Sequence, residues 1–367
     1  MAEHRAVNRG AILGLDIGGA NDKAVRLEPS GEVGGEASIP LELWRDPSKL
    51  VEELRGLNDR LDAAGCSHAA LTLTGELCDS FSSKREGVNF ICGAVREAFP
   101  GLAVLVLDVE SQTWERAERV AEAPLRFAAN NWLASALHVA TRHPDGLLMD
   151  VGSTTTDIIP IVNGAVAARG RTDTQRLASG ELVYTGILRA NPDTLVRSVP
   201  VGGGLCRVAA ERFCLMADVH LLLGNITPRD YTCPTADGRG TSLPEARQRL
   251  AKLVCADYED PGEASGKERG EALGAAALLA VARYVYEAQL HRLTGAALQV
   301  LSRLTEAKAA PPVVLAAGSG AFVAEEVGWR LGMEVLAFPS SSAGRHGPVL
   351  PALAAAILLE NHLRGAS

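Results

Sequence analysis

Aromatic side chains are scarce in this sequence, and basic charge is limited. Aromatic residues make up 4% of the 367 residues, and 36 Lys and Arg are outnumbered by 44 Asp and Glu, for a formal net charge of −8. Proteins that coat nucleic acid need basic surfaces and commonly use aromatic stacking platforms. The composition therefore argues against a nucleic-acid partner.

Long apolar runs are absent as well. The apolar segment 11–15 ends at Asp16, short of the about 7–15 apolar residues that a secretory signal requires. The segments 275–282 and 353–359 end at Arg283 and Glu360, far from the ~20 residues of a membrane-spanning helix. We expect a cytoplasmic location and no membrane partner.

Paired cysteines are the third absence. The sequence has seven Cys, an odd number, widely spaced and without a Cys-x-x-Cys pair. This pattern argues against a disulfide framework and against a zinc or iron–sulfur site. Reduced and mostly buried thiols are the expectation.

Small and aliphatic residues are abundant instead. The hydrophobic fraction is 47%, with 37 Gly, and such an apolar content excludes intrinsic disorder. The length suggests about two domains. Because Ala and Gly allow helices to pack closely on a sheet, the composition favours a soluble α/β fold.

Two stretches of the sequence follow the same plan, a strand, a Gly-containing loop and returning strands. The first comprises strand 12–17, the turn Gly18-Gly19 and strands 23–28 and 33–39. The second comprises strand 147–151, loop 152–157, strand 158–162, the turn Asn163-Gly164 and strand 165–169. Sequence identity between them is slight, so we interpret them as a duplication of fold.

Other segments complete the predicted order of elements. Helices are expected at 46–64 (opened by Asp46-Pro47), 124–141, 271–294, 296–307 (separated by Gly295) and 347–363, and buried strands at 69–74, 103–108 and 312–317. Residues 225–270 are polar and irregular, with one helix at 244–256. They indicate an insertion or cap.

The first Gly-containing loop carries candidate chemistry. Asp16 ends a buried strand and is followed by Gly18 and Gly19, with Asn21 and Lys23 close behind. Exposed backbone N–H groups in such a turn can bind phosphate oxygens, and the carboxylate can bind a divalent metal. The alternative is an ordinary hairpin with a Gly-Gly turn.

The second loop repeats this arrangement with more polar groups. Asp150 is followed by Gly152, four hydroxyl residues and a second carboxylate, as the run Gly152, Ser153, Thr154, Thr155, Thr156, Asp157 shows. Hydroxyl and N–H groups suit phosphate oxygens, and two carboxylates suit Mg²⁺ or general-base work. A Thr-rich edge turn is the alternative, although two such loops together are more specific than one.

A third candidate loop is Gly318-Ser319-Gly320, which follows a predicted strand. Gly-x-Gly lets a nucleotide approach the backbone, but a simple strand–helix turn is the better explanation of this loop taken alone. No Walker-type phosphate loop, Gly-x-Ser-x-Gly elbow or His-Glu-x-x-His motif is found in the sequence.

The paired Asp-Gly loops, the late Gly-x-Gly and the closing small-residue helix resemble the actin, sugar-kinase and Hsp70 superfamily. The resemblance implies an α/β protein of two ribonuclease-H-like domains, with mixed sheets flanked by helices and a central cleft holding phosphate and Mg²⁺. It places the first domain at 1–140 and the second at 141–346, with an inserted cap at about 220–270. A closing helix at 347–367 would pack at the domain interface.

Longer motifs resemble one branch, the hydantoinase/oxoprolinase-related proteins of the tetrahydromethanopterin-linked one-carbon pathway. The resemblance rests on the runs 72–81 (TLTGELCDSF), 84–88 (KREGV), 127–136 (FAANNWLASA), 179–186 (SGELVYTG) and 235–240 (TADGRG). It implies a late step of methanofuran synthesis, in which a tyramine-type phenol (γ-glutamyltyramine) is joined to an aminomethylfuran carried as its methyl diphosphate. Diphosphate is released.

The resemblance also implies roles for particular residues. Asp16 and Asp150 would hold Mg²⁺ or a similar divalent metal, and Asp157 or Glu181 would take the phenol proton. Phosphate or a substrate carboxylate would bind to Lys23, Lys84, Arg85 or Arg171, with Glu76 also in the substrate site. The alternatives are a solvated loop for 84–86 and a helix-capping carboxylate for Glu181.

Competing functions remain open at this stage. An ATP-dependent small-molecule kinase or hydantoinase/oxoprolinase-like amide hydrolase is the main alternative, and a nucleotide switch is a third. ATP is compatible with the leading interpretation but not required by it, and a homo-oligomer is compatible with all three. An iron–sulfur activase of the same superfamily is disfavoured by the unpaired cysteines.

Overall fold

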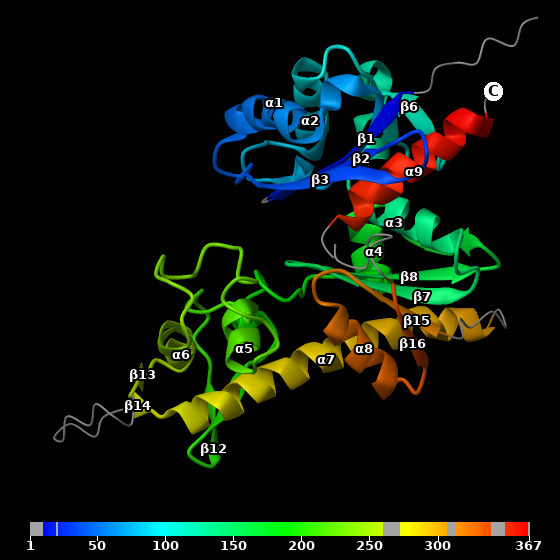
Figure 1. Cartoon of the computed structure of the whole chain (residues 1–367). Coiled ribbons are helices and arrows are strands. Elements are labelled where there is room, and N and C mark those ends of the chain that lie inside the picture. The colour runs from blue at the N-terminus through cyan, green and yellow to red at the C-terminus, as the bar shows by residue number, and fades with distance from the viewer. Residues whose placement is uncertain (1–9, 20, 260–271, 307–312, 339–348, 366–367) are drawn as a thin grey trace, which may run out of the picture. The chain divides into compact units, whose positions relative to one another are not determined.

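The computed structural model describes residues 10–19, 21–259, 272–306, 313–338 and 349–365. The chain divides into two compact units that interleave along the sequence (Figure 1). The first unit comprises Met1–Leu148, Ile159–Arg176 and Phe338–Ser367, and the second comprises Met149–Ile158 and Leu177–Ala337. The domains predicted from the sequence are instead consecutive segments, 1–140 and 141–346 with a closing helix at 347–367. That division stays a proposal.

A mixed six-stranded sheet organises the first unit. Its order is β3 (Val33–Pro40), β2 (Asn21–Leu27), β1 (Ala11–Ile17), β4 (Cys66–Leu73), β5 (Ala103–Leu107) and β6 (Trp114–Arg116). β1 pairs antiparallel with β2 and parallel with β4. Every residue of β1 is buried, Asp16 included, as expected for a central strand that is covered on both faces.

Helices cover this sheet. α1 (Leu50–Leu61) buries its leucines at 50, 54, 57 and 61, the spacing of one helix face. α2 (Lys84–Ala98) is capped at its N-terminus by Ser83, whose hydroxyl accepts the Glu86 N–H at 3.2 Å. α9 (Leu350–Gly365) lies against β1, β2 and β4 (Figure 1). A Cβ at Gly14 of β1 would collide with the Ala352 carbonyl of α9, so the strand and helix can approach only at a glycine.

A second sheet has the order β10 (Leu182–Val183), β8 (Thr156–Val162), β7 (Gly146–Val151), β15 (Val313–Ala317) and β16 (Glu334–Ala337). β9 (Ala165–Val166) pairs antiparallel with β8, as β3 does with β2. β15 and β16 are parallel, as β4 and β5 are. The common order supports the duplication inferred from the sequence.

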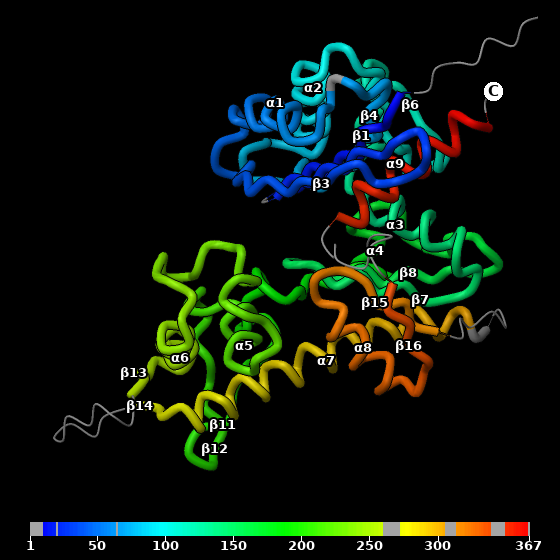
Figure 2. The backbone as a smooth tube through the Cα atoms, viewed as in Figure 1, coloured from blue at the N-terminus to red at the C-terminus, as the bar shows by residue number. Residues whose placement is uncertain are grey.

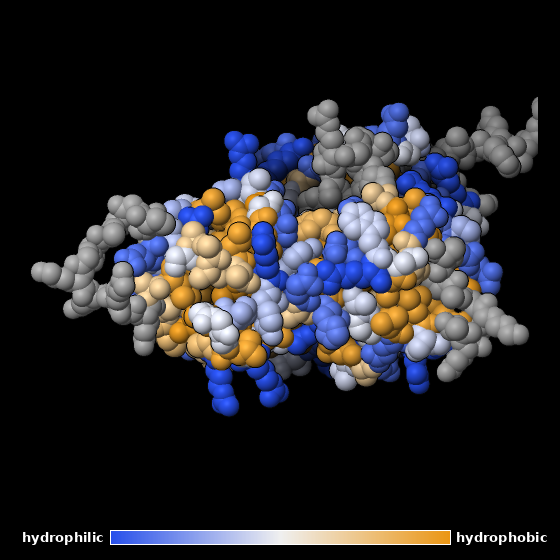
Figure 3. Space-filling model, turned by 90° about the horizontal axis from the view of Figure 1, so that it is seen from below, coloured by the Kyte–Doolittle hydropathy of each residue, from blue (hydrophilic) through white to orange (hydrophobic). Residues whose placement is uncertain are grey.

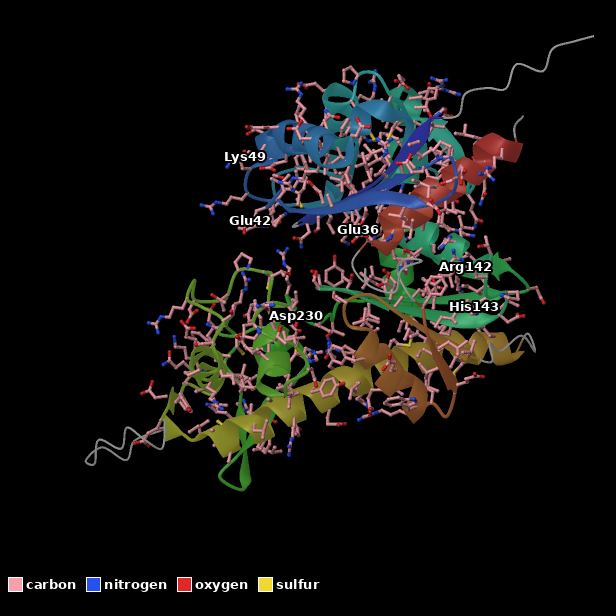
Figure 4. All side chains as sticks on the ribbon, in the orientation of Figure 1. Glu36, Glu42, Lys49, Arg142, His143 and Asp230 are labelled. Carbon is pink, nitrogen blue, oxygen red and sulfur yellow. The ribbon has the colours of Figure 1, made fainter. Side chains whose placement is uncertain are left out.

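Helices and short hairpins build the rest of the chain, whose path can be followed in Figure 2. The remaining helices are α3 (Asn131–Ala140), α4 (Asp173–Ser179), α5 (Met216–Leu222), α6 (Leu243–Lys252), α7 (Ala275–Glu306) and α8 (Ala321–Arg330). The remaining strands are β11 (Ser198–Val201), β12 (Gly204–Arg207), β13 (Asp257–Tyr258) and β14 (Ala272–Leu273). The helix predicted at 244–256 corresponds to α6, while residues 260–270 of the predicted insertion lie outside the described residues and the insertion as a whole stays a prediction. Asp230 lies in its first part (Figure 4), where its carboxylate accepts the Thr227 N–H and hydroxyl at 2.7 Å each.

One predicted interruption is wrong. We expected two helices separated by Gly295, but α7 continues through that residue for 32 residues. A helical glycine costs only about 1 kcal/mol relative to Ala. The flanking residues Leu290, Leu293, Ala297 and Val300 are fully buried, and their burial offsets that cost.

The predicted helix 124–141 is also wrong in its first half. The segment begins with a 3₁₀ turn at Pro124–Phe127, and α3 begins only at Asn131. Between them Ala129 has a φ of 47°. The Asn130 side chain accepts the Leu73 N–H at 2.8 Å and donates to the Leu107 carbonyl at 2.7 Å. The chain leaves the helical path here because Asn130 binds two strands of the sheet.

The predicted helix 46–64 is shorter than expected. Pro47–Lys49 form a 3₁₀ turn before α1, and Asp46 makes no side-chain capping bond.

Among the helices that the structure describes, none has the length and apolarity to cross a membrane. The face shown in Figure 3 intersperses hydrophobic (orange) with hydrophilic (blue) residues.

Candidate functional site

The first predicted aspartate lies between two polar side chains of neighbouring strands. The register pairs Asp16 of β1 with Lys23 of β2 and with Thr72 of β4. The Thr72 hydroxyl donates to Asp16 Oδ1 at 3.2 Å, and Lys23 Nζ lies 3.4 Å from Oδ2. Asp16 is 2% exposed, so the sheet itself orients this carboxylate.

The loop after Asp16 is held by a residue that the sequence pattern did not single out. Asp22 is buried, and its Oδ1 accepts the Gly18 N–H at 3.1 Å. Burial raises the pKa of Asp22 well above its usual value. Because this bond occupies the Gly18 amide, phosphate binding by that N–H would require Asp22 to release it.

The motif at 72–81, which carries part of the family resemblance, packs against the loop that follows Asp16. A Cβ on Gly19 would lie 2.8 Å from Cys78 Sγ, and a Cβ on Gly75 would lie 3.0 Å from the Gly18 carbonyl oxygen. Gly87, in the first turn of α2, has no room for a side chain beside the backbone of Glu76. The first Asp-Gly loop, the 3₁₀ turn Gly75–Leu77 and the start of α2 therefore form one continuous site in the first unit.

Glu76 is a second buried acid of this site. It is 1% exposed, and its Oε2 has no hydrogen-bond partner among the residues that the structure describes. Burial raises the pKa of Glu76 to about 7, a rise opposed by the Glu76 and Ala129 backbone N–H groups and by Lys84, and increased by Asp173. A carboxyl with this pKa can exchange a proton near neutral pH.

Lys84 lies between Glu76 and Asp173, an acid that is 89 residues away in the sequence. Its Nζ lies 3.9 Å from Glu76 Oε1 and forms a short ion pair with Asp173 at the start of α4. The Lys84 side chain is 27% exposed, whereas that of Glu76 is 1% exposed. Of the other predicted substrate residues, Arg85 is exposed on α2. Arg171 has a buried Nη1 without a partner in the described chain.

The second loop belongs to the second unit and has a defined backbone. The Gly152 N–H donates to the Thr155 carbonyl at 2.9 Å, and the Gly152 carbonyl accepts the Ile187 N–H at 3.0 Å. The Ser153 carbonyl accepts the N–H groups of Leu188 and Arg189 at 2.9 and 2.8 Å. Within the described residues, the amides at 153–155 have no hydrogen-bond acceptor. These three N–H groups remain available to an anion.

Two other predicted residues of this loop lie on β8. The Thr156 hydroxyl donates to the Thr185 carbonyl at 2.7 Å, so it has a structural partner. Asp157 is in register with Leu182 of β10.

The third loop packs directly on the second. Gly318 has a φ of 84°, and a Cβ there would collide with Asp150 Oδ1 and the Val151 carbonyl. The Gly320 N–H donates to the same Val151 carbonyl at 2.8 Å, while Ser319 is exposed. Within the second unit the fold thus brings together the predicted loops around Asp150 and Gly318.

We expect Gly318→Ala to lower the free energy of unfolding by more than Gly332→Ala. Both glycines have positive φ, at 84° and 67°, but the space around Gly332 is open. The control carries only the backbone cost, about 1 kcal/mol, whereas Gly318→Ala adds a clash with Asp150 and should total about 2–3 kcal/mol. Urea unfolding of both variants measures the difference, and equal losses would contradict the close packing of the two loops.

Glu181 has partners of its own. This carboxylate is fully buried, accepts the Ser179 hydroxyl at 2.9 Å and pairs with Arg303 of α7. The run 235–240 is likewise tied to a buried cation, since Arg249 Nη1 donates to Asp237 Oδ1 and to the Gly240 carbonyl at 3.2 and 3.0 Å. These contacts stabilise the second unit, and the catalytic role predicted for Glu181 stays a prediction.

No group of three or more His, Cys, Asp or Glu is arranged for a metal among the residues that the structure describes. Asp16 and Asp150 belong to different units, so their joint metal binding also stays a prediction. The donor chemistry fits a hard cation, because carboxylate and hydroxyl oxygens are the ligands that Mg²⁺ prefers.

Three residues of the site, Thr72, Asp173 and Asp22, were not among those predicted from the sequence. Thr72 could have been found only by aligning β4 beside β1, and Asp173 is 89 residues from its partner Lys84. Asp22 carried a weak signal, because it shares the inward alternation of β2 with buried Ala24.

Comparisons with known proteins agree with this architecture. The hydantoinase/oxoprolinase family profile matches residues 68–358. A Methanocaldococcus jannaschii protein named (4-{4-[2-(gamma-L-glutamylamino)ethyl]phenoxymethyl}furan-2-yl)methanamine synthase is 39% identical over 249 residues, 68% of this chain and 72% of that protein. A Methanococcus vannielii protein of the same name is 40% identical over 111 residues, 30% of this chain and 50% of that protein.

One solved structure has a comparable fold. It is the nucleotide-free structure of acetone carboxylase, from a study of ATP-dependent acetone carboxylation, with a TM-score of 0.56 and 11% identity. The match covers 95% of this chain and 70% of that chain. The predicted fold class, α/β with mixed sheets flanked by helices, is confirmed.

Proposed function

The chain belongs to the hydantoinase/oxoprolinase family, and from this membership we propose that it is a synthase of methanofuran-type cofactor biosynthesis. The observation that carries the proposal is 39% identity over 72% of the Methanocaldococcus jannaschii synthase. The name of that enzyme's product contains a phenoxymethyl group, an ether between a γ-glutamyltyramine unit and an aminomethylfuran unit. The enzyme is thus a transferase that acts on small molecules.

The proposed reaction forms one bond and breaks one. The phenol oxygen of γ-glutamyltyramine bonds to the methyl carbon of the furanylmethyl diphosphate, and the carbon–oxygen bond to diphosphate breaks. The electron pair leaves with diphosphate, and the phenol proton passes to a base. The barrier falls if negative charge on the leaving group is stabilised as it develops.

The two Asp-Gly loops supply groups for that stabilisation. The amides at 153–155 lack acceptors within the described residues and suit diphosphate oxygens, with Lys23 as a further cation. Mg²⁺ held by Asp16 and Asp150 would neutralise charge on the diphosphate when bound.

Glu76 is our preferred proton acceptor. Its pKa of about 7 lies below the ~10 of a phenol, close enough for general-base catalysis at neutral pH. Glu181 is less suited, because its carboxylate already pairs with Arg303, and Asp157 is retained as the second choice. Arg85 and Arg171 are proposed to bind the carboxylate of the γ-glutamyl group, whereas Lys84, 3.9 Å from Glu76, lowers the pKa of the base.

The decisive experiment supplies both substrates. The protein is incubated with Mg²⁺, an aminomethylfuran methyl diphosphate and γ-glutamyltyramine, and the ether is followed by mass spectrometry alongside released diphosphate. We expect ether and diphosphate in equal amounts without ATP. ATP consumption with no ether would instead support an ATP-dependent kinase or amide hydrolase, for which the fold of the ATP-dependent acetone carboxylase leaves room.

A further inference from the structure

A buried chain of polar side chains crosses the second unit from α5 to the segment beside the second loop. Its centre is Gln289 of α7, which is fully buried. Gln289 Nε2 donates to the Thr185 hydroxyl and to the Gly186 carbonyl, both at 3.0 Å, and its Oε1 lies 3.1 Å from His220 Nε2. Helices α5 and α7, which carry the two side chains, pack side by side (Figure 2).

The bonding pattern assigns the direction of every proton. Both N–H bonds of Gln289 are used, so its oxygen must accept and His220 must carry its proton on Nε2. His220 Nδ1 is then an acceptor for the Asn225 amide at 3.1 Å. Burial lowers the pKa of His220 to about 4, so the ring is neutral at physiological pH. The hydrogen bonds therefore all run in one direction: Asn225 donates to His220, His220 donates to Gln289, and Gln289 donates to the Gly186 carbonyl.

The backbone that receives these bonds supports the second loop. Gly186 packs against Gly152, Ser153 and Thr154 with no room for a Cβ. The next three amides, at 187–189, donate to the carbonyls of Gly152 and Ser153. The first turn of α5 binds the same segment, because the Ala217 N–H donates to the Leu188 carbonyl at 3.1 Å. We call residues 185–189 the supporting segment.

We propose that Gln289, with His220, is a positioning residue of the diphosphate site. By fixing the supporting segment, it directs the carbonyls of the second loop inward and leaves the amides at 153–155 for the ligand. The identity of the ligand rests on the proposed function. A buried amide and imidazole are costly unless fully bonded, and an apolar residue would join α5 and α7 without that cost. Gln289 and His220 are polar, and their hydrogen bonds end on the Gly186 carbonyl of the supporting segment, which packs against the second loop.

The primary test compares Gln289→Met with Leu278→Ala, a core substitution on the same helix at another fully buried position. Backbone hydrogen exchange, melting temperature and binding of inorganic diphosphate with Mg²⁺ are measured for each. We expect Gln289→Met to speed exchange of the hydrogen-bonded amides at Gly152 and at 187–189 and to weaken diphosphate binding roughly tenfold or more. Leu278→Ala should lower the melting temperature while leaving diphosphate affinity near that of wild type.

His220→Phe gives a second test if Gln289→Met does not fold. Phe preserves the ring that contacts Tyr286 and Phe322, with centroid separations of 5.3 and 5.4 Å, but removes both hydrogen bonds. With substrates, either network variant should raise KM for the furanylmethyl diphosphate and leave KM for the phenol unchanged. Unchanged exchange at Gly152 and at 187–189, or affinity losses that follow the melting temperature in both network and control variants, would overturn the proposal.

Failure of the proposed function gives a different result. If wild type binds no diphosphate but Gln289→Met still speeds exchange at Gly152 and at 187–189 selectively, the positioning role holds and the assigned ligand is wrong. If wild type binds diphosphate and the network variants bind it equally well, the positioning role is wrong and the proposed function is unaffected.

Discussion

Asp16→Asn and Asp150→Asn are each expected to lower kcat by at least about 10³-fold, because metal stabilisation of a leaving phosphate contributes several kcal/mol. Asn has the shape of Asp but no charge. In Asp16→Asn the Thr72 hydroxyl keeps an acceptor, so the fold should survive. Activity is measured as ether formation at saturating Mg²⁺, with circular dichroism as the check on folding.

The same chemical change away from the loops provides the control. Asp59 is exposed on α1, and Asp59→Asn should leave both activity and stability unchanged. Turnover at the wild-type rate in Asp16→Asn or Asp150→Asn would contradict the metal assignment. Loss of folding in either variant would show that the carboxylate is structural.

Glu76→Gln is expected to lower kcat/KM by roughly 10²–10³-fold, the contribution of a general base. In the wild type kcat/KM should rise with pH and reach half its maximum near pH 7, since the base acts only when ionised and burial raises its pKa to about 7. The groups that face it are Lys84, Asp173 and the backbone N–H groups of Glu76 and Ala129. A pH–rate profile of the variant should lack this ionisation.

Stability provides an independent readout of the same carboxyl. Its pKa is higher in the folded protein than in the unfolded chain, whose value is about 4.5, so the folded state holds the proton more tightly. The free energy of unfolding should therefore decrease as the pH rises from about 4.5 to 7, by on the order of 3 kcal/mol. Glu76→Gln should abolish that decrease.

Lys84→Met serves as the matched control for Glu76. Lys84 lowers the pKa of Glu76, so its removal should move the rising limb of the pH–rate profile to higher pH without abolishing it. An unchanged profile in both Glu76→Gln and Lys84→Met would mean that another group, with Asp157 as the next choice, accepts the proton.

Local patterns predicted most of the elements that carry the site. The expected strands at 12–17, 23–28 and 33–39 correspond to β1, β2 and β3, and a loop joins β7 and β8 as expected, although it spans 152–155 and not 152–157. These predictions succeed because strand alternation and Gly-containing turns are properties of neighbouring residues. The failures at Gly295 and Ala129 have the opposite cause. At Gly295 burial of the helix offset a weak local preference, and at Ala129 the side chain of Asn130 bonded to distant strands.

The sequence by itself determined that two Asp-Gly loops end buried strands and that the chain carries the motifs of its family. Only the tertiary structure decided what each polar group does there. Asp22 occupies the Gly18 amide, Lys84 meets Asp173 across 89 residues, and Gln289 reaches Thr185 across 104. The physical reason is that a carboxyl's pKa and an amide's availability depend on desolvation and on partners from other segments. Those quantities do not exist until the segments pack.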